Sequence, residues 1–160
     1  MTARMNPLQP RMKAASTILP DVAKGIQTMI GAIYKSGAPR ATLEFVHLRA
    51  SQINGCGPCI DSGWRGAKKA GESDERLHNV VAWRHTPYFS DAERAALALA
   101  ESMTRLADRD DPVPDAVWEE AARHHDEKSL AAIVSFIALT NLFNRLNVAT
   151  GVVAAGEQWG

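Results

Sequence analysis

The only two cysteines of the chain stand three positions apart in the segment NGCGPC, residues 54–59. Gly55 is suited to ending one helix, and Pro58 is suited to the first turn of the next, where its missing N–H costs nothing. Both sulfurs are then expected at a helix N-terminus. The partial positive charge there favours a thiolate, and a spacing of three positions on a helix can close a disulfide. We therefore predict that Cys56 and Cys59 form a reversible dithiol–disulfide pair.

Three other interpretations of the cysteine pair remain open. The cysteines could be two buried neighbours without a chemical role. They could bind zinc, although the other ligands would have to come from five histidines in no recognised spacing, namely His47, His78, His85, His124 and His125. The tetrapeptide CGPC also occurs in thioredoxin-like folds, but there it follows a buried strand, whereas residues 43–54 have the pattern of a helix. We predict no metal and no cofactor.

Two side chains ahead of the dithiol could handle protons. Glu44 could act as a general base, and His47 lies one helical turn further on, so the two can share a face. On a helix each could equally be a solvated surface group. Near the other end of the chain, four polar residues interrupt an apolar helix, and their simplest role is to hold helix ends by hydrogen bonds: Asn141, Asn144, Arg145 and Asn147.

The composition fits one domain that needs no metal or structural disulfide for its stability. Of its 160 residues 46% are hydrophobic, enough for a core without metal or structural disulfide. Eighteen basic residues balance eighteen acidic ones, which argues against a nucleic-acid partner or an anionic membrane surface. The N-terminus lacks the apolar stretch of a signal peptide, and the apolar run at residues 130–139 is too short to cross a bilayer. We expect a cytoplasmic protein with a small-molecule or protein partner.

Apolar periodicity predicts an all-α fold with no strand. An N-terminal arm is expected over residues 1–20, one helical domain over 21–150, and a tail over 151–160. The expected helices are 21–36, 39–54, 56–71, 73–83, 90–106, 115–124 and 129–147. Residues 130–139 are apolar almost all round, so we expect part of this helix to contact another subunit of a homo-oligomer.

From about residue 20 to residue 150 the sequence resembles the AhpD-like alkylhydroperoxidase branch of the carboxymuconolactone decarboxylase superfamily. The resemblance is carried by LEFVHLRASQINGCGPCIDSG at residues 43–63, by AGESDERL and AWRHTPYFSDAERAALALAESMT, and by NRLNVATG at residues 144–151. It implies an all-helical fold, assembled as trimers or as hexamers built from dimers. The decarboxylases of this superfamily lack the cysteine pair, so the resemblance points to thiol chemistry.

The resemblance also implies roles for single residues. Glu44 would be the distal base, Cys59 would attack a peroxide, and Cys56 would resolve the sulfenic acid to a disulfide. A histidine four residues after the second cysteine completes the family's proton relay, but this chain has Gly63 there. We expect His47 to substitute for it, and a Gly63→His change to raise activity.

Two functions follow from these observations. The first is a thiol-dependent oxidoreductase that reduces hydroperoxides or disulfides and is re-reduced by an external dithiol. The alternative is a redox sensor or binding protein that keeps the dithiol but has lost peroxidase turnover together with the histidine.

Overall fold

Helices make up all the regular secondary structure of residues 9–154, the part of the chain that the computed structural model describes. In chain order they are α1 (Ala15–Ile18), α2 (Pro20–Tyr34), α3 (Arg40–Asn54), α4 (Gly57–Lys69), α5 (Asp74–Asn79), the 3₁₀ helix η1 (Val80–His85), α6 (Asp91–Thr104), α7 (Asp115–His124) and α8 (Glu127–Thr150). The predicted all-α fold is confirmed.

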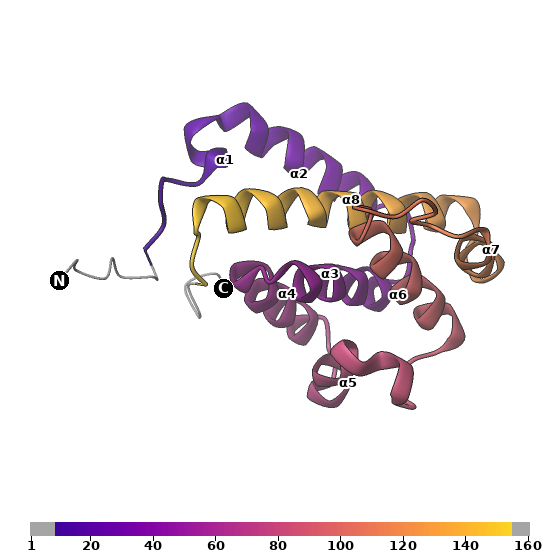
Figure 1. Cartoon of the computed structure of the whole chain (residues 1–160). Helices are drawn as coiled ribbons and strands as arrows, with labels where there is room; N and C mark the ends of the chain where they lie inside the picture. The colour runs from indigo at the N-terminus through magenta and orange to yellow at the C-terminus, as the bar shows by residue number, and fades with distance from the viewer. Residues whose placement is uncertain (1–8, 155–160) are drawn as a thin grey trace.

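The long helix α8 lies at the centre of the bundle. It packs against α2, α3 and α6, and Figure 1 shows it running between α2 above and α3 and α4 below. Buried side chains from α3 and α8, including Leu43, Val46, Ile133 and Ile137, form the main hydrophobic core. Burial of such side chains is the principal favourable term that holds a fold together. The α3–α8 pair is therefore the main structural unit of the molecule.

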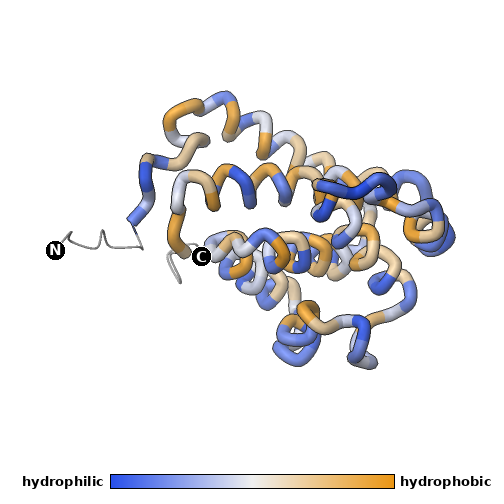
Figure 2. The backbone as a smooth tube through the Cα atoms, in the orientation of Figure 1, coloured by the Kyte–Doolittle hydropathy of each residue, from blue (hydrophilic) through white to orange (hydrophobic). Residues whose placement is uncertain are grey.

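Helix α3 is buried on its other side as well. Phe45 and Leu48 belong to a second hydrophobic cluster with Leu77, Trp83 and Phe89, which α5, η1 and the loop before α6 supply. In Figure 2 the hydrophilic residues concentrate on peripheral segments such as α7, while hydrophobic positions recur along α8. Because α3 lies between two cores, polar side chains on it are enclosed by protein instead of facing water.

Most helix boundaries agree with the sequence prediction, and two segments differ. Ser90 and Glu93 form the predicted capping box at the start of α6. The helix expected over residues 73–83 divides into α5 and η1, with non-helical backbone at Ala82. The expected arm contains a short helix, α1, and α2 begins at Pro20, one residue earlier than predicted.

The N-terminal segment is attached to the end of α8 in the same chain. The backbone N–H of Arg11 donates to the carbonyl of Thr150 at 2.7 Å, and its guanidinium donates to the carbonyl of Ala149 at 2.9 Å. These contacts use carbonyls that the last turn of a helix leaves without intrahelical partners. Residues 11–19 are therefore held over one end of the bundle.

Helix α8, with 24 residues, is long and apolar enough to cross a membrane by length and composition alone. The sequence analysis did not anticipate this, because it considered only residues 130–139. Half of the most apolar stretch of α8 is buried inside the structure. A central helix of a packed bundle has this composition because it contacts neighbours on several sides. The contacts of α8 with α2, α3 and α6 identify it as a core helix.

Most of the apolar circumference of residues 130–139 is covered within one chain. Leu130, Ile133, Phe136 and Ile137 are buried in the bundle, and α8 packs against α2, α3 and α6. Ala131 and Ala138 remain exposed, as does Leu142 further along the helix. The expected contact of this helix with a second subunit therefore stays a prediction. Other exposed apolar side chains include Ile18, Val22 and Met29 of α1 and α2.

A polar network inside the bundle joins the end of α3 to α8. The amide of Asn54 donates to the side-chain oxygens of Asn141 and Asn144 at 3.0 and 2.9 Å. Asn144, which is fully buried, donates in turn to the hydroxyl of Ser51 at 3.1 Å. The interpretation of Asn141 and Asn144 as residues that hold helix ends is confirmed. Since Asn54 directly precedes Gly55 and the dithiol, this network fixes where the cysteine segment begins.

We predict that Asn144→Leu lowers the free energy of unfolding by about 1–3 kcal/mol, because it removes an acceptor from Asn54 and a donor to Ser51 inside the protein. Urea unfolding of the oxidised protein measures the change. The control is Asn79→Ala, which removes a surface hydrogen bond to the carbonyl of Glu75 and should cost less than about 0.5 kcal/mol. Wild-type stability in Asn144→Leu would contradict this account of the network.

Candidate active site

The cysteine pair closes a disulfide at the start of α4. Cys56 is the N-cap residue of this helix, Pro58 lies in its first turn, and the two Sγ atoms are 2.11 Å apart. Gly55 ends α3 in the left-handed conformation at φ 65°, and the N–H of Cys56 donates to the carbonyl of Ser51 at 3.0 Å. The left-handed conformation favours glycine at this position, because glycine carries no Cβ. The predicted helix break and disulfide pairing are confirmed.

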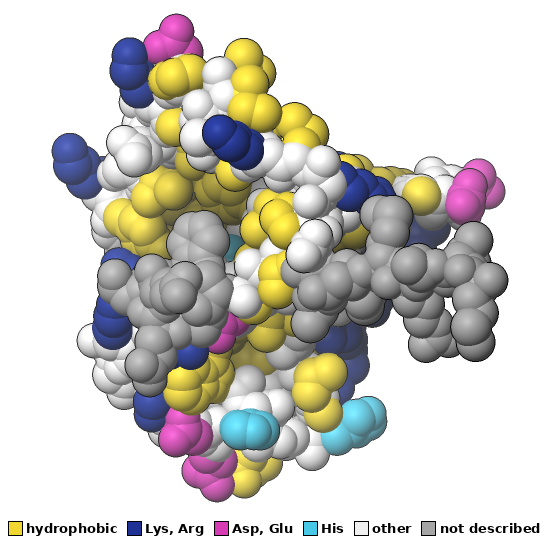
Figure 3. All heavy atoms as spheres, turned by 90° about the vertical axis from the view of Figure 1, so that its left-hand side faces the viewer, with side chains coloured by type: hydrophobic (Ala, Val, Ile, Leu, Met, Phe, Trp, Pro, Cys, Tyr) yellow, Lys and Arg dark blue, Asp and Glu magenta, His cyan; other side chains and the backbone are white. Residues whose placement is uncertain are grey.

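The disulfide is buried, and its two halves line different hollows. Cys59 lines a cavity of about 290 Å³ together with His47, Phe143 and Asn147, and Ala14 and Ser16 of the N-terminal segment complete its wall. Figure 3 views this end of the molecule, where hydrophobic side chains gather around a hollow below the uppermost helices. The cavity offers a small molecule a place beside Cys59.

Cys56 borders a second hollow of about 400 Å³. Its wall is formed by the Gly55–Pro58 turn and by the last turn of α8 with the residues that follow, including Val148, Gly151 and Val152. Pro58, Asn147 and Val152 line both hollows. These three residues therefore form the partition between the two hollows, and the disulfide lies beside it.

His47 is buried against Cys59, where it contacts the backbone and not the sulfur. Its Nε2 lies 3.1 Å from the carbonyl oxygen of Cys59, and its Nδ1 lies 3.1 Å from the hydroxyl of Thr140. A carbonyl oxygen only accepts, so Nε2 carries the proton and Nδ1 of the neutral ring accepts from Thr140. Burial lowers the pKa of His47, which favours this neutral form.

Gly63 leaves the space that the ring of His47 occupies. A Cβ atom at position 63 would lie 2.6 Å from Cδ2 and 2.9 Å from Nε2 of His47, and 3.2 Å from Leu48. Such distances are shorter than van der Waals contact, so a side chain at 63 and the present ring of His47 exclude each other. A histidine at position 63 would therefore require the ring of His47 to move. The expectation that Gly63→His raises activity stays a prediction.

Glu44 is also buried, although it makes no hydrogen bond to His47. Its Oε1 accepts from the guanidinium of Arg40 at 2.6 Å and from the hydroxyl of Tyr34 at 3.3 Å. Burial and the neighbouring carboxylate raise the pKa of Tyr34 to about 12, so Tyr34 stays protonated and donates. A solvated surface position, the other possibility for Glu44 and His47, is excluded by the burial of both side chains.

A cavity of about 200 Å³ separates Glu44 from the dithiol. Glu44, His47, Gly63 and Phe143 are among its lining residues. His47, Ser62 and Phe143 line this cavity and also the cavity beside Cys59. The ring of His47 is therefore one of the side chains that lie between the cavity of Glu44 and the cavity of Cys59.

Asn147 is the site residue that the sequence analysis assigned to a different role. Its Nδ2 lies 3.4 Å from Sγ of Cys59 and 3.8 Å from Sγ of Cys56. The spacing of Asn141, Asn144 and Asn147 at three-residue steps was a signal that all three share one side of α8. Asn147 differs from Asn141 and Asn144 only because the cysteine turn packs against the end of α8, where Asn147 lies.

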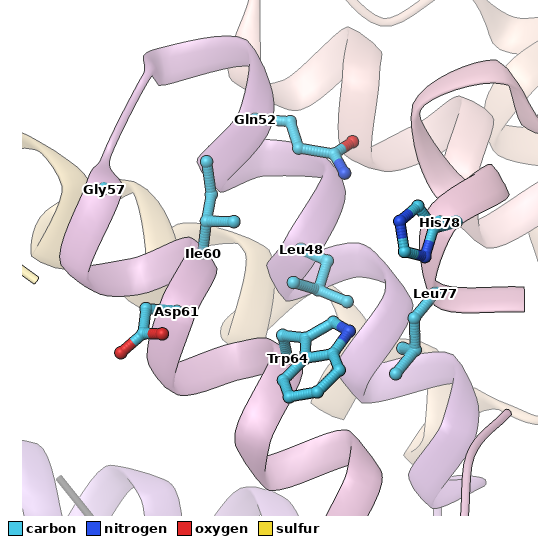
Figure 4. Close-up of a pocket in the computed structure, with 8 residues that line it drawn as sticks. All are labelled: Leu48, Gln52, Gly57, Ile60, Asp61, Trp64, Leu77 and His78. Atoms are coloured by element: carbon cyan, nitrogen blue, oxygen red, sulfur yellow. The ribbon is translucent and has the colours of Figure 1, made fainter. Parts of the chain in front are cut away.

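A larger hollow of about 440 Å³ lies away from this chemistry. Figure 4 shows its wall, in which Trp64 of α4 lies beside Leu48 of α3, with Ile60 and Asp61 of α4 on one side and His78 of α5 on the other. Neither cysteine, Glu44 nor His47 lines it. Over residues 9–154, no three His, Cys, Asp or Glu side chains are grouped so that they could hold a metal ion. The disulfide and its adjoining cavities thus remain the strongest candidate for a catalytic centre.

Comparison with known sequences identifies a family. The profile of the carboxymuconolactone decarboxylase family matches residues 20–102. The uncharacterised protein YdfG of Bacillus subtilis is 34% identical over 140 residues, which cover 88% of this chain and 94% of that protein. The matched residues include α3 and the dithiol.

Comparison with solved structures gives the same fold. A protein of unknown function from Agrobacterium tumefaciens, proposed to be the antioxidant defence protein AhpD, superposes with a TM-score of 0.85 at 25% identity, covering 93% of this chain and all of that one. The debrominase Bmp8 superposes with a TM-score of 0.76 at 22% identity, covering 87% of this chain and 74% of that one. At that identity the second similarity concerns the fold alone.

We predict that His47 makes stability depend on pH. As the pH falls through about 6.5, a histidine of the unfolded chain binds a proton that buried His47 does not, so the free energy of unfolding falls. One such group contributes a slope of at most about 1.4 kcal/mol per pH unit. Urea unfolding between pH 5 and 7 should show a smaller slope for His47→Gln than for the wild type.

The matched control is the exposed histidine His78, because His78→Gln should keep the wild-type slope. Equal slopes for the wild type and His47→Gln would contradict a neutral, buried His47.

Proposed function

Because the chain belongs to the carboxymuconolactone decarboxylase family, in its AhpD-like branch, we propose that it is a thiol-dependent oxidoreductase whose Cys56–Cys59 pair reduces a hydroperoxide. One observation carries the proposal. The two cysteines form a disulfide whose second member borders a cavity beside a buried histidine. A pair that is already joined becomes a reactive dithiol when it takes up two electrons and two protons from outside.

The reaction divides into three balanced steps. The thiolate of Cys59 attacks the peroxide, an S–O bond forms, the O–O bond breaks, and the released alkoxide takes a proton to leave as an alcohol. The thiolate of Cys56 then attacks the sulfenic acid of Cys59, so that the disulfide forms and the hydroxide is protonated to water. An external dithiol reduces the disulfide by two successive exchanges and is itself oxidised.

His47 is the proposed carrier of the protons in these steps. It lies between the Glu44 cavity and the Cys59 cavity, and a neutral imidazole can take up a proton and return it. In the disulfide form both ring nitrogens are engaged, with Thr140 and with the carbonyl of Cys59. The ring therefore has to release one contact when the dithiol forms. Glu44 is the proposed distal acceptor.

The cavity beside Cys59 favours a small organic hydroperoxide over a protein substrate. Its volume is about 290 Å³, and Phe143, Val152 and Pro58 supply apolar wall area. A cavity of this size accommodates a small molecule and excludes a folded partner. Ala14 and Ser16 close it from the N-terminal side, which further limits access from outside.

We predict that the reduced protein consumes cumene hydroperoxide in steady state when a dithiol donor such as dithiothreitol or dihydrolipoamide is present. Loss of peroxide, followed colourimetrically, measures turnover. Cys59→Ser and Cys56→Ser should each reduce the rate at least about a hundredfold, because either change prevents the disulfide cycle. A wild-type rate no higher than that of Cys59→Ser would support the redox-sensor or binding function instead.

The role of His47 is tested separately by moving the imidazole. We predict that His47→Ala reduces peroxide turnover at least about tenfold, as expected when a group that transfers protons is lost. Because His47→Ala vacates the space beside position 63, His47→Ala combined with Gly63→His should recover part of the rate. His78→Ala is the surface control. Unchanged turnover in His47→Ala would remove His47 from the mechanism.

We also propose that the protein assembles as a homo-oligomer through the surface formed by α1 and α2. Ile18, Leu19, Val22 and Met29 are exposed large apolar side chains there, and exposed apolar side chains that lie together often mark a protein–protein contact. Light scattering at micromolar concentration should give a trimer or a hexamer. Met29→Glu should lower the mass, whereas Val81→Glu, at an exposed apolar residue of η1, should not. A monomeric wild type would reject this proposal.

A further inference from the structure

We propose that Asn147 is a catalytic residue of the dithiol centre, whose side-chain amide stabilises Cys59 as a thiolate. This inference rests on the proposed dithiol function, because it concerns the reduced form of the pair. It assigns a role to an amide of α8 that the peroxide mechanism above does not use.

The geometry places the amide against both sulfurs. Nδ2 of Asn147 is 3.4 Å from Sγ of Cys59 and 3.8 Å from Sγ of Cys56. The sulfurs of a disulfide carry no hydrogen, so only the donor side of the amide fits here. In the described part of the chain, no other side-chain donor makes a hydrogen bond to either sulfur. His47 and Ser62 donate to the carbonyl of Cys59 instead.

A hydrogen bond to a thiolate is worth more than the same contact to a disulfide. Sulfur in a disulfide is a weak acceptor, whereas the charged thiolate is a strong one, and hydrogen bonds to charged groups are about twice as strong as neutral ones. Cys59 is buried, and burial alone would favour the uncharged thiol. A donor fixed 3.4 Å from its sulfur opposes that effect. Asn147 therefore gains most of its interaction energy when the disulfide opens.

The end of α8 is clamped, which holds the amide in position. The carbonyl of Asn147 accepts from the N–H of Val152 at 3.0 Å, and Gly151 ends the helix in the left-handed conformation. One turn further, the carbonyl of Thr150 accepts from the N–H of Arg11. A donor whose backbone is fixed on both sides loses little conformational freedom when it binds a developing charge.

The contact also orders the exchange reaction. When the thiolate of an external dithiol attacks Sγ of Cys56, a new S–S bond forms and the Cys56–Cys59 bond breaks. The electron pair of that bond passes to Cys59, which leaves as a thiolate and accepts the hydrogen bond from Asn147. The second thiol of the reductant then releases Cys56. A leaving thiolate that is better stabilised departs faster, so the amide favours Cys59 as the leaving sulfur and as the next nucleophile.

The test measures thiol acidity and needs no turnover. In the full-length Cys56→Ser protein, the rate of iodoacetamide alkylation of Cys59 is followed by mass spectrometry between pH 5 and 10, with and without a change at Asn147. Asn147→Ala removes the donor, and we expect the apparent pKa of Cys59 to rise by about one unit, a tenfold smaller thiolate fraction at neutral pH. Asn147→Asp adds a negative charge and should raise the pKa further.

Thr150→Val is the matched control, since it removes a hydrogen bond to the carbonyl of Leu146 in the same turn without touching a sulfur. Its thiol pKa should equal that of Cys56→Ser alone. Asn147→Ser, which keeps a short polar side chain, carries the test if Asn147→Ala does not fold. An unchanged Cys59 pKa in the Ala or Ser variant and in the Asp variant would overturn the proposal.

A second measurement uses the unaltered cysteines. In glutathione redox buffers, Asn147→Ala should shift the dithiol–disulfide equilibrium about tenfold toward the disulfide, because the reduced form loses its stabilising donor. These readouts also separate the two proposals. A shifted pKa in a protein without peroxide turnover would keep Asn147 and reject the peroxidase. Peroxide turnover together with an unshifted pKa of Cys59 would keep the peroxidase and reject the role of Asn147.

Discussion

The contact between α3 and α8 determines the geometry on which the rest of the site depends. Along α8, Thr140 meets His47, Asn141 and Asn144 hold Asn54, and Asn147 meets the sulfurs. These residues follow one another at one- and three-residue steps, so they lie on one side of the helix. Because the side is polar within an apolar core, each group needs its partner on α3 or on the cysteine turn. Helices α3 and α8 therefore pack in one register, and this register places the disulfide beside His47.

The same alignment explains why a side chain at position 63 and the ring of His47 would compete for one space. The AhpD-like pattern has a histidine on the helix that carries the cysteines, whereas this chain has an imidazole on the helix before it. A Cβ atom at position 63 would lie 2.6 Å from the ring, so the two arrangements are alternatives and cannot coexist without movement. In this chain the ring of His47 donates to the carbonyl of Cys59 and not to its sulfur. The direct polar contact to sulfur comes instead from an amide, Asn147.

Much of the fold could be predicted from local signals. The capping box at Ser90, the break at Gly55 and the apolar periodicity fixed most helices, because these features act within a few residues. The burial of Glu44 and His47 could not be predicted, since α3 is enclosed by two cores whose members come from distant segments. The role of Asn147 was missed for a related reason. Its partners lie 88 and 91 residues away, and only the packing of α4 against α8 brings them together.

The central claim is that Cys56 and Cys59 are a working redox pair that a small hydroperoxide can reach. A single-turnover experiment tests it most directly: the reduced protein is mixed with one equivalent of cumene hydroperoxide, alkylated and weighed by intact mass spectrometry. The account predicts that one peroxide removes both thiols, that neither cysteine is then alkylated, and that dithiothreitol restores both. Two cysteines that are still alkylated after exposure to peroxide, or a sulfinic acid formed without a disulfide, would contradict it.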